Sequence, residues 1–354
     1  MKKLICTLLS LSLILCAFTG CQENGEKPES SVSEENYVPD SASDFVYTEN
    51  GEEIKITGYK GASLNVNIPA EIDGKPVTAI GEYAFDGFEA ADSEEQKQGK
   101  AYKENNINSI KSIHIPSGVK TLEKGAFTNC YSLETVTLPE GLEKICEGAF
   151  ACCDAIKSVT IPSTVKIIEG YVFYQCYGLS EITIGKNTES IGEYAFLSCK
   201  NLTSVKLPDS VNAVGTGCFA SCYGLTKAEL SSSITEIPDY CFYDTSVSEI
   251  KLHKGVTKIG DLAFCRSSDL SEIKIPSSVV SIGEKAFYTC PVLTKIEVPE
   301  TVTEIGSQAF GYTMDAEKPD EDTPVLQEDF TIKAKKGSAA EKYAEENGIA
   351  CKAG

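Results

Sequence analysis

The sequence predicts a right-handed solenoid of the α/β type, rich in short strands that are joined by short helical turns. A fixed period, an alternating apolar pattern and regularly placed prolines predict it. Nine phenylalanines recur 23 residues apart, with one spacing of 22. They are Phe127, Phe150, Phe173, Phe196, Phe219, Phe242, Phe264, Phe287 and Phe310. Such a period indicates one coil per repeat, and the coils must stack because one coil alone cannot bury its apolar face.

Each repeat opens with a short strand. In one unit, Leu133, Val136 and Leu138 are apolar, and the alternation at the last two predicts a strand with one buried face. Pro139 follows directly and ends the strand, because proline has no N–H to donate to a sheet. A second apolar pair, such as Val165 and Ile168 in the next unit, then begins the return leg, and the phenylalanine fills the interior.

Both ends of the solenoid have predicted caps. At the N-terminal end, residues 45–48 and 53–57 flank Asn50 and Gly51, a pair that suits a type I′ turn and predicts a β-hairpin. At the C-terminal end, we expect a strand near residues 330–334 and then a helix. Ser338 and Glu341 form a capping-box pattern at its start, and Gly348 stops it.

Negative charge is concentrated outside the repeats. Residues 22–53 carry ten acidic residues and one lysine, and residues 315–329 carry seven and one, in a chain of formal net charge −20. The repeats are therefore nearly neutral and lack the clustered basic residues that bind a phosphate backbone. The only arginine is Arg266, so paired arginine clamps are also absent. Nucleic acid is excluded as a partner.

The N-terminus predicts export. Met1 and two lysines precede an apolar run over residues 4–18, which is too short for a spanning helix and is typical of a secretory signal. The small residues before Cys21 resemble a bacterial lipobox, which implies that Cys21 is lipidated and begins the mature chain. The alternative is an ordinary signal peptide with an incidental cysteine. The predicted location is the extracellular face of a bacterial membrane, with the lipid as the only membrane contact.

The segments follow from these patterns. The polar, acidic stretch after Cys21 has few apolar residues and predicts a disordered tether. The extra length between Phe85 and Phe127 predicts a polar insert, which is either a binding loop or a tolerated surface loop. The expected divisions are a signal peptide (1–20), an acidic tether (21–44), an N-terminal cap with the first strand (45–80), the repeats (81–314) with the insert at about 89–108, an acidic linker (315–329) and a C-terminal cap (330–354).

A line of cysteines follows the phenylalanines by three residues. It comprises Cys130, Cys153, Cys176, Cys199, Cys222 and Cys290. Neighbouring Cβ atoms would lie about 4.8 Å apart, beyond the usual reach of a disulfide, which favours buried thiols. Export favours disulfides instead, and Cys146, Cys152, Cys265 and Cys351 leave room for one or two bridges.

The sequence predicts no catalytic site, metal site or cofactor. The cysteines are spread along an axis, whereas metal ligands converge on a point. His114 and His253 are the only histidines and belong to different coils, so no nucleophile and base can be paired. We therefore expect a protein that is not an enzyme.

The repeat resembles the BspA-like branch of the leucine-rich repeat family. The pattern L-x-x-V-x-L-P, then V-x-x-I, then A-F-x-x-C-x-x-L carries the resemblance over about residues 45–350. The resemblance implies a leucine-rich repeat solenoid that binds protein partners on its strands and adheres to host or neighbouring-cell proteins. This rests on analogy of fold and identifies no ligand.

The outward positions of the strands are the candidate binding face. They are His114, Thr135, Thr137, Ser158, Thr160, Thr183, Lys206, Glu229, Lys251, Lys274 and Glu297. Alternating charges on neighbouring strands, as at Lys206 and Glu229, fit structural support equally well, and threonine is also simply a good strand residue. Tyr131, Tyr177 and Tyr223 follow alternate cysteines and are a candidate aromatic edge, although tyrosine can equally cover the core there.

These observations lead to one main hypothesis. The chain is predicted to be a non-enzymatic, lipid-anchored surface protein that presents a repeat face to an extracellular or host protein. The alternative is a scaffold that organises other cell-envelope components. A thiol redox protein is a third possibility, and it would need an accessible cysteine of low pKa.

Overall fold

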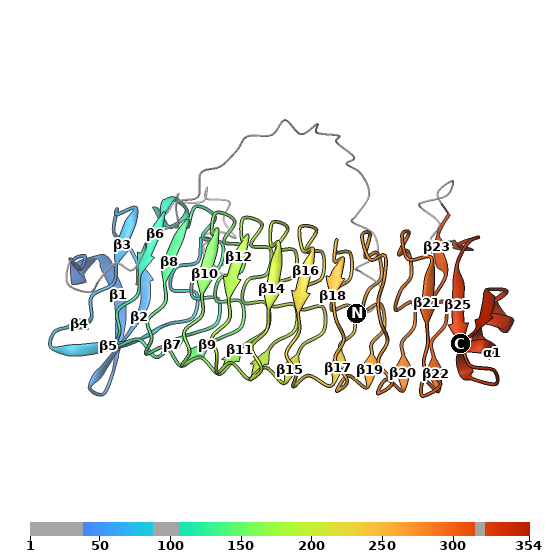
Figure 1. Ribbon diagram of the computed structural model, residues 1–354. Helices are drawn as coiled ribbons and strands as arrows, with labels where there is room; N and C mark the ends of the chain where they lie inside the picture. Colours follow the sequence, from blue (N-terminus) through green and yellow to red (C-terminus); the bar gives the residue numbers. More distant parts are fainter. Residues whose placement is uncertain (1–37, 88–105, 316–322) are drawn as a thin grey trace, which may run out of the picture. The chain divides into compact units, whose positions relative to one another are not determined.

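The computed structural model describes residues 38–87, 106–315 and 323–354. The predicted signal sequence, Cys21 and most of the acidic tether lie outside these residues, as does the greater part of the predicted insert. The described chain confirms the predicted solenoid, since its coils stack along one axis from the N-terminal to the C-terminal cap (Figure 1).

One strand of each coil lies on what we call the strand face. These strands are β3 (Asn65–Asn67), β6 (Ser112–His114), β8 (Thr135–Thr137), β10 (Ser158–Thr160), β12 (Glu181–Thr183), β14 (Ser204–Lys206), β16 (Lys227–Glu229), β18 (Glu249–Ile250), β21 (Lys295–Glu297), β25 (Thr331–Ala334) and β26 (Ala350–Ala353). They form four short parallel sheets, β3-β6-β8, β10-β12, β14-β16-β18 and β21-β25-β26, in which equivalent residues are in register, as Val159 of β10 is with Ile182 of β12. The 23-residue period therefore places equivalent side chains in rows.

A second row of strands forms the return face. These strands are β5 (Lys75–Ile80), β7 (Thr121–Leu122), β9 (Lys144–Ile145), β11 (Ile167–Ile168), β13 (Ser190–Ile191), β15 (Ala213–Val214), β17 (Glu236–Ile237), β19 (Lys258–Ile259), β20 (Ser281–Ile282) and β22 (Glu304–Ile305). β5 to β15 belong to one parallel run, and β17 to β22 form another. The second residue of most of these strands is buried, so the first one points to solvent.

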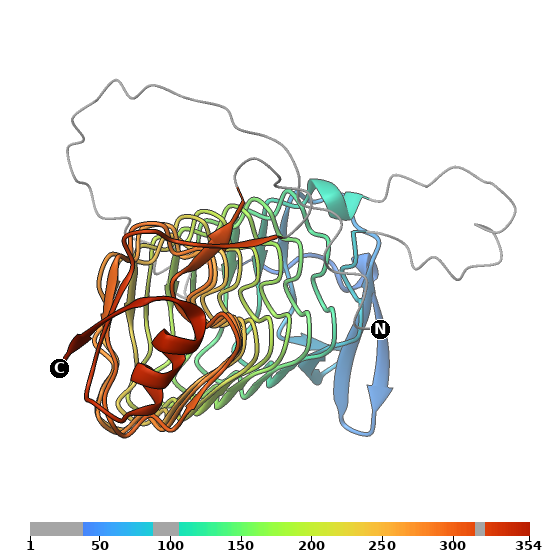
Figure 2. The same cartoon turned by 90° about the vertical axis from the view of Figure 1, so that its right-hand side faces the viewer.

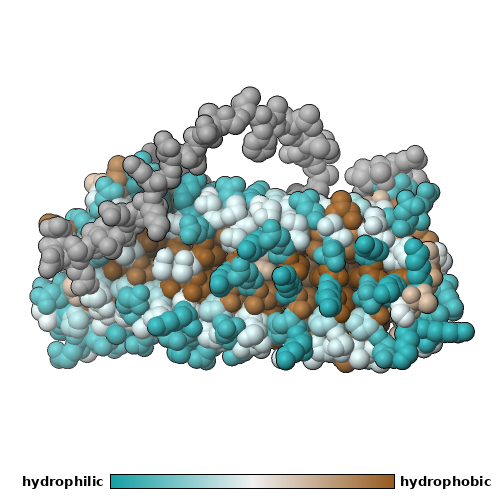
Figure 3. Space-filling view, viewed as in Figure 1, coloured by the Kyte–Doolittle hydropathy of each residue, from teal (hydrophilic) through white to brown (hydrophobic). Residues whose placement is uncertain are grey.

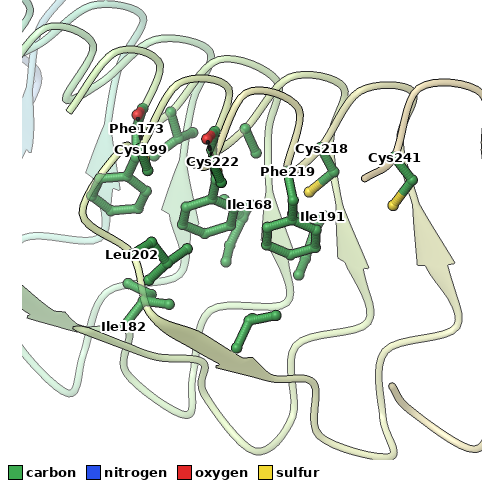
Figure 4. Close-up of a cluster of buried hydrophobic side chains, with 14 of the residues drawn as sticks. Ile168, Phe173, Ile182, Ile191, Cys199, Leu202, Cys218, Phe219, Cys222 and Cys241 are labelled. Atoms are coloured by element: carbon green, nitrogen blue, oxygen red, sulfur yellow. Dashed lines mark hydrogen bonds between the residues drawn. The ribbon is translucent and has the colours of Figure 1, made fainter. Parts of the chain in front are cut away.

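The phenylalanines form a continuous stack inside the coils. Phe85 and the nine later phenylalanines are fully buried. Ring centroids of successive coils lie 5.1 to 5.8 Å apart, in near-parallel stacks. Figure 4 shows Phe173 and Phe219 in this row, with Ile168 and Ile191 of the return face beside it. Each ring contributes about 1.5–3 kcal/mol through burial alone, so the stack is a principal source of stability.

The turns around each phenylalanine form a third ladder between coils. The Phe150 N–H donates to the Val172 carbonyl of the next coil at 2.9 Å, and the Phe173 N–H donates to Ala195 at 2.8 Å. The predicted short helical turns are isolated turns with i to i+3 bonds, such as Tyr174 N–H to the Tyr171 carbonyl. Left-handed residues such as Tyr171 (φ 59°) interrupt them, so they do not extend into helices.

Glycines on the return side permit close approach of neighbouring coils. A Cβ added to Gly192 would lie 2.4 Å from the Gly170 nitrogen and 2.5 Å from the Glu169 carbonyl carbon. Because both atoms belong to the backbone, a larger residue could fit only if the coils separated.

The N-terminal cap is a hairpin of β1 (Phe45–Asn50) and β2 (Glu53–Tyr59), and β2 continues the return face by pairing with β5. Tyr59 links the cap to the core, since its ring stacks on Phe85 at 5.6 Å. The predicted hairpin is confirmed, but the predicted turn type is wrong. Of the two central residues of this turn, Gly51 and Glu52, only Gly51 has a positive φ, whereas a type I′ turn needs positive values at both. A short 3-10 helix (Ala42–Asp44) precedes the hairpin, and β4 (Glu71–Ile72) pairs back onto β5.

The C-terminal cap contains the predicted strand and helix. Helix α1 (Ala339–Asn347) lies across the last coil (Figure 2), with the Ser338 hydroxyl accepting the Glu341 N–H and Gly348 left-handed at its end. Tyr343 of α1 ends the ring stack, because its hydroxyl accepts the Phe310 N–H at 3.2 Å and its ring meets Phe310 edge-on.

Three segments depart from the sequence expectations. Residues 271–276 form no strand, and this break follows the coil that is one residue short, where β18 also has only two residues. Part of the expected acidic linker is β24 (Pro324–Leu326), which pairs antiparallel with β23 (Tyr312–Met314). Residues 106–109, at the end of the expected insert, form a 3-10 helix that buries Ile107.

Candidate binding faces

The strand face presents the predicted outward residues to solvent. In β8, β10, β12, β14 and β16 the first and third residues are exposed. Lys251, Lys274 and Glu297 are also exposed, and His114 is half-buried. The strands thus hold two parallel rows of side chains. The binding role of these residues stays a prediction.

Parts of the C-terminal half of this face pair their charges internally, whereas Lys251 and Lys274 make no ion pair within the described ranges. Glu229 accepts from Lys206 of the preceding strand at 3.4 Å and from Lys227 of its own strand at 3.1 Å. These lysines, Lys227 first, hold the pKa of the Glu229 carboxyl below its usual value. Further along, Glu297 pairs with Lys333 at 3.3 Å. The Lys206–Glu229 and Lys333–Glu297 pairs join neighbouring strands and support them directly.

The N-terminal half carries a different surface, which we call the hydroxyl patch. Its members are Thr135, Thr137, Ser158, Thr160 and Thr183. Their hydroxyls make no hydrogen bond to any residue in the described ranges, whereas the nearby Ser112 hydroxyl donates to Asn65 at 2.8 Å. Figure 3 shows brown, apolar residues along the middle of the molecule, with several teal side chains lying across them toward the C-terminal end.

The predicted aromatic edge does not form a continuous stripe. Tyr131, Tyr177 and Tyr223 belong to alternate coils, and no two of their rings are in contact. Each ring meets other neighbours: the Tyr131 hydroxyl bonds to Asn129, Lys200 lies over Tyr177 at 4.4 Å, and Tyr223 lies beside Asp244. Alternate coils are about 9–10 Å apart, which is too far for rings to stack.

The cysteine line lies in the interior, and its thiols are hydrogen-bond donors. Cys176 Sγ donates to the Phe150 carbonyl at 3.0 Å, one coil back, and Cys199 does the same to Phe173 at 3.2 Å. Cys130, Cys153, Cys222 and Cys290 repeat this contact. Where the row has a serine, the Ser267 hydroxyl takes the role by donating to Phe242 at 3.2 Å. The row therefore adds a donor to carbonyls that are buried between coils, some of which, such as Phe173, also accept a backbone N–H from the residue three positions on.

All twelve cysteines of the described ranges are free thiols, including Cys146, Cys152, Cys265 and Cys351. Burial raises the pKa of Cys176 and Cys199 well above the usual value and that of Cys222 to about 12. Such thiols are protonated at neutral pH and are poor nucleophiles.

Within the described ranges, no group of three or more histidine, cysteine or acidic side chains is placed to hold a metal ion. His253 accepts the Gly255 N–H through Nδ1 at 3.0 Å, within its own turn. No helix there is long and apolar enough to span a bilayer.

Sequence reasoning missed a cluster of tyrosines beside the return face. The Tyr171 and Tyr194 rings are in tilted contact with centroids 5.3 Å apart, and Tyr174 meets Tyr171 edge-on at 5.9 Å. Tyr171 and Tyr194 lie two residues before the phenylalanine, where other coils have Gly148 and Gly217. The sequence signal that could have predicted this cluster is the shared repeat position of the two tyrosines. Each residue at this position adopts a left-handed backbone, and equivalent residues of adjacent coils lie side by side.

Comparisons with known proteins agree with this architecture. A family profile described as a BspA type leucine-rich repeat region, in six copies, matches residues 98–226 and 189–317. A crystal structure of the pneumococcal vaccine antigen PcpA covers 90% of this chain and 99% of its own, at 17% identity and a TM-score of 0.50, and shows a shared fold.

Two further solved structures are similar. A leucine-rich repeat protein of T. pallidum is 25% identical over 72% of this chain and 91% of its own, with a TM-score of 0.43. A leucine-rich cell surface protein of Faecalibacterium prausnitzii is 23% identical over 85% and 89%, with a TM-score of 0.48. A search of curated proteins found no match.

Proposed function

Because the chain belongs to the BspA-type leucine-rich repeat family, we propose that it is a non-enzymatic cell-surface protein that binds other proteins through its strand face. The hydroxyl patch is the observation that carries this proposal. Its five hydroxyls are exposed on consecutive strands and have no partner among the described residues. A protein partner can bond to them without first breaking an internal contact, which favours binding because a broken bond would offset a new one.

The patch also suits a broad protein contact. Strands about 4.8 Å apart form a nearly flat surface, and the threonine methyl groups add apolar area between the hydroxyls. The five patch residues carry no charge themselves, and the exposed Glu181 of β12 lies beside them in register with Ser158. The charged half of the same face would have to give up its internal ion pairs to bind as well.

We further propose that the partner is a host or neighbouring-cell protein and that a lipid on Cys21 holds the chain at the outer face of the membrane. The apolar run over residues 4–18 and the small residues before Cys21 support export and lipidation. The acidic segment that follows would hold the solenoid away from the surface. This arrangement places the hydroxyl patch where partners on another surface can reach it.

The binding proposal can be tested with cells that display the full-length chain. One variant carries glutamate at Thr135, Thr137, Ser158 and Thr160. A matched control carries glutamate at four exposed positions off the strand face, namely Ala213, Thr235, Ser277 and Thr301. Cells would be exposed to extracellular-matrix proteins and to envelope fractions, and captured proteins would be quantified.

The expected result is loss of capture by the strand-face variant alone, at equal surface levels and equal thermal stability. Equal capture by both variants would reject the strand face as the binding surface. For the anchor, Cys21→Ser should abolish incorporation of labelled palmitate and release the chain from the membrane fraction. Retention of the label by this variant would contradict lipidation at Cys21.

A further inference from the structure

A shallow depression of about 350 Å³ lies on the return face, away from the strand face. It spans the coils of Phe150, Phe173 and Phe196. Its lining includes Ile167, Tyr171 and three glutamates, Glu147, Glu169 and Glu193, together with Gly170 and Gly192. The two glycines leave the space open, and the Glu193 side chain lies over Gly170, with its Cγ 3.2 Å from the position a Cβ would take.

Apolar and aromatic side chains line part of the depression at positions where other coils have different residues. Ile167 is apolar, yet it occupies the outward position of its strand and is 49% exposed. The equivalent residues of neighbouring coils are Lys144, Ser190 and Ala213. Tyr171 contacts Tyr194 in a left-handed position that glycine fills elsewhere without strain. An exposed apolar side chain beside half-buried aromatic rings is typical of a contact surface.

The three carboxylates differ in their partners. Glu147 pairs with Lys124 at 3.1 Å, and Glu169 pairs with Lys144 at 3.0 Å while also accepting the Glu147 N–H at 2.9 Å. The Glu193 carboxylate has no ion pair or hydrogen bond to any residue in the described ranges. It nevertheless lies close to both tyrosines: after burial, it is the largest cause of the raised pKa of Tyr171 and of Tyr194.

We propose that this depression binds the side chain of a lysine from a partner protein. The ammonium group would lie against the Tyr171 ring, which Tyr194 contacts, with Glu193 as its counter-ion, and the aliphatic stem would cover Ile167. Aromatic rings attract cations through their negative faces, and a nearby carboxylate adds to that attraction. A lysine fits because it combines an apolar stem with a compact charge, which matches the order of apolar, aromatic and acidic groups here.

This proposal does not depend on the hydroxyl patch, because the depression lies on another face. A partner could use either surface alone. The Glu193 carboxylate is the group that distinguishes a lysine site from a purely apolar contact, since an apolar partner would leave it without a counter-ion.

The test uses the purified full-length chain and two capped hexapeptides, one of alternating lysine and valine and one with glutamine in place of lysine. The variants are Glu193→Gln and Tyr171→Gly, and glycine suits this position because Gly148 and Gly217 occupy its equivalents. The controls are Glu284→Gln and Tyr83→Gly, at the same repeat positions in distant coils. Affinity would be measured by calorimetry at two salt concentrations, after circular dichroism has shown that each variant is folded.

We expect the lysine peptide to bind more tightly than the glutamine peptide, and more weakly at higher salt. Each site variant should lower its affinity by about three- to tenfold, the range for a cation on an aromatic ring or beside a carboxylate. The control variants should bind like wild type. Equal binding of the two peptides, equal losses in site and control variants, or no binding of the lysine peptide at millimolar concentration would each overturn the proposal.

Discussion

The two halves of the strand face are built on the same backbone, but they use their polar groups differently. In the N-terminal half, Thr135, Thr160 and their neighbours hold hydroxyls without partners among the described residues. In the C-terminal half, Glu229 is paired with lysines on two sides. The repeat therefore fixes where side chains point, and the choice of side chain decides whether a strand binds its neighbours or remains available to a partner.

The interior differs between the halves as well. The coils of Phe127 to Phe219 carry an unbroken cysteine row, whereas the next two coils carry Thr245 and Ser267 at that position. Thr245 donates to Phe242 of its own coil at 3.0 Å, so it does not reach back as the thiols do. The two halves should thus respond differently to conditions that ionise thiols.

The largest expected effect is alkaline unfolding that begins in the N-terminal half. Burial raises the pKa of Cys153, Cys176, Cys199 and Cys222, the last to about 12. The protonated thiols stabilise the fold fully below the unfolded value of about 8.5, and this stability is lost as pH rises toward the folded pKa, at about 1.4 kcal/mol per pH unit for each thiol. Cys218 of the same half is also buried with a raised pKa, whereas the corresponding thiols of the C-terminal half are Cys241 and Cys290. Because the N-terminal half has more of these thiols, pulsed alkylation between pH 8 and 11, mapped by mass spectrometry, should label its cysteines before Cys290. Simultaneous labelling of both halves would contradict the difference.

The second effect should be the same in both halves. Phe150→Ala and Phe287→Ala each remove a buried ring from the stack and should each lower the free energy of unfolding by about 3–5 kcal/mol. Denaturant unfolding of the two variants measures this, with Phe→Leu at the same positions as a milder control. A much smaller loss at either position would show that the stack does not contribute equally along the solenoid.

The third effect concerns the thiol contact. Cys176→Ala leaves the Phe150 carbonyl without the thiol and should cost about 1–3 kcal/mol, while Cys176→Ser should retain most of the stability. Ser267→Ala is the corresponding change in the other half and should cost less, because the Thr245 hydroxyl still donates to the Phe242 carbonyl. If the serine variant is as unstable as the alanine variant, the thiol acts by filling space and the hydrogen bond contributes little.

The smallest expected effect is the coupling free energy of the ion pair on the strand face. A double-mutant cycle of Lys206→Ala and Glu229→Ala should give a weak coupling that disappears in about 1 M salt, because exposed pairs are screened. Thr160→Ala with Thr183→Ala, the matched pair in the hydroxyl patch, should give no coupling at any salt concentration. Coupling between the threonines would mean that the patch is internally bonded and less available to a partner.

Much of the fold could be predicted because one coil repeats. Phe150, Leu133 and Pro139 each recur at a fixed spacing, so a single assignment of strand, turn and core extends along the chain. The strand-face residues followed from the same alternation. The caps could be predicted from local signals, with Ser338 and Gly348 bounding the helix as expected.

Other features depend on contacts between coils that the period does not reveal. The thiol of Cys176 has a role only because the Phe150 carbonyl of the preceding coil lies next to it. The Tyr171 and Tyr194 pair depends on a left-handed backbone that both glycine and tyrosine adopt in different coils. The missing strand at residues 271–276 follows a coil of 22 residues, and the sequence shows the deletion but not how the neighbouring strands respond.

The Phe150 N–H donates toward the C-terminal end, as its counterparts do along the chain, until the Tyr343 hydroxyl accepts from the last of them, Phe310. Every interior coil thus makes the same N–H to carbonyl contact with the coil before it and with the coil after it. Insertion or deletion of gene segments that encode whole coils would preserve these hydrogen bonds. The length of the solenoid could then change while both caps stay the same.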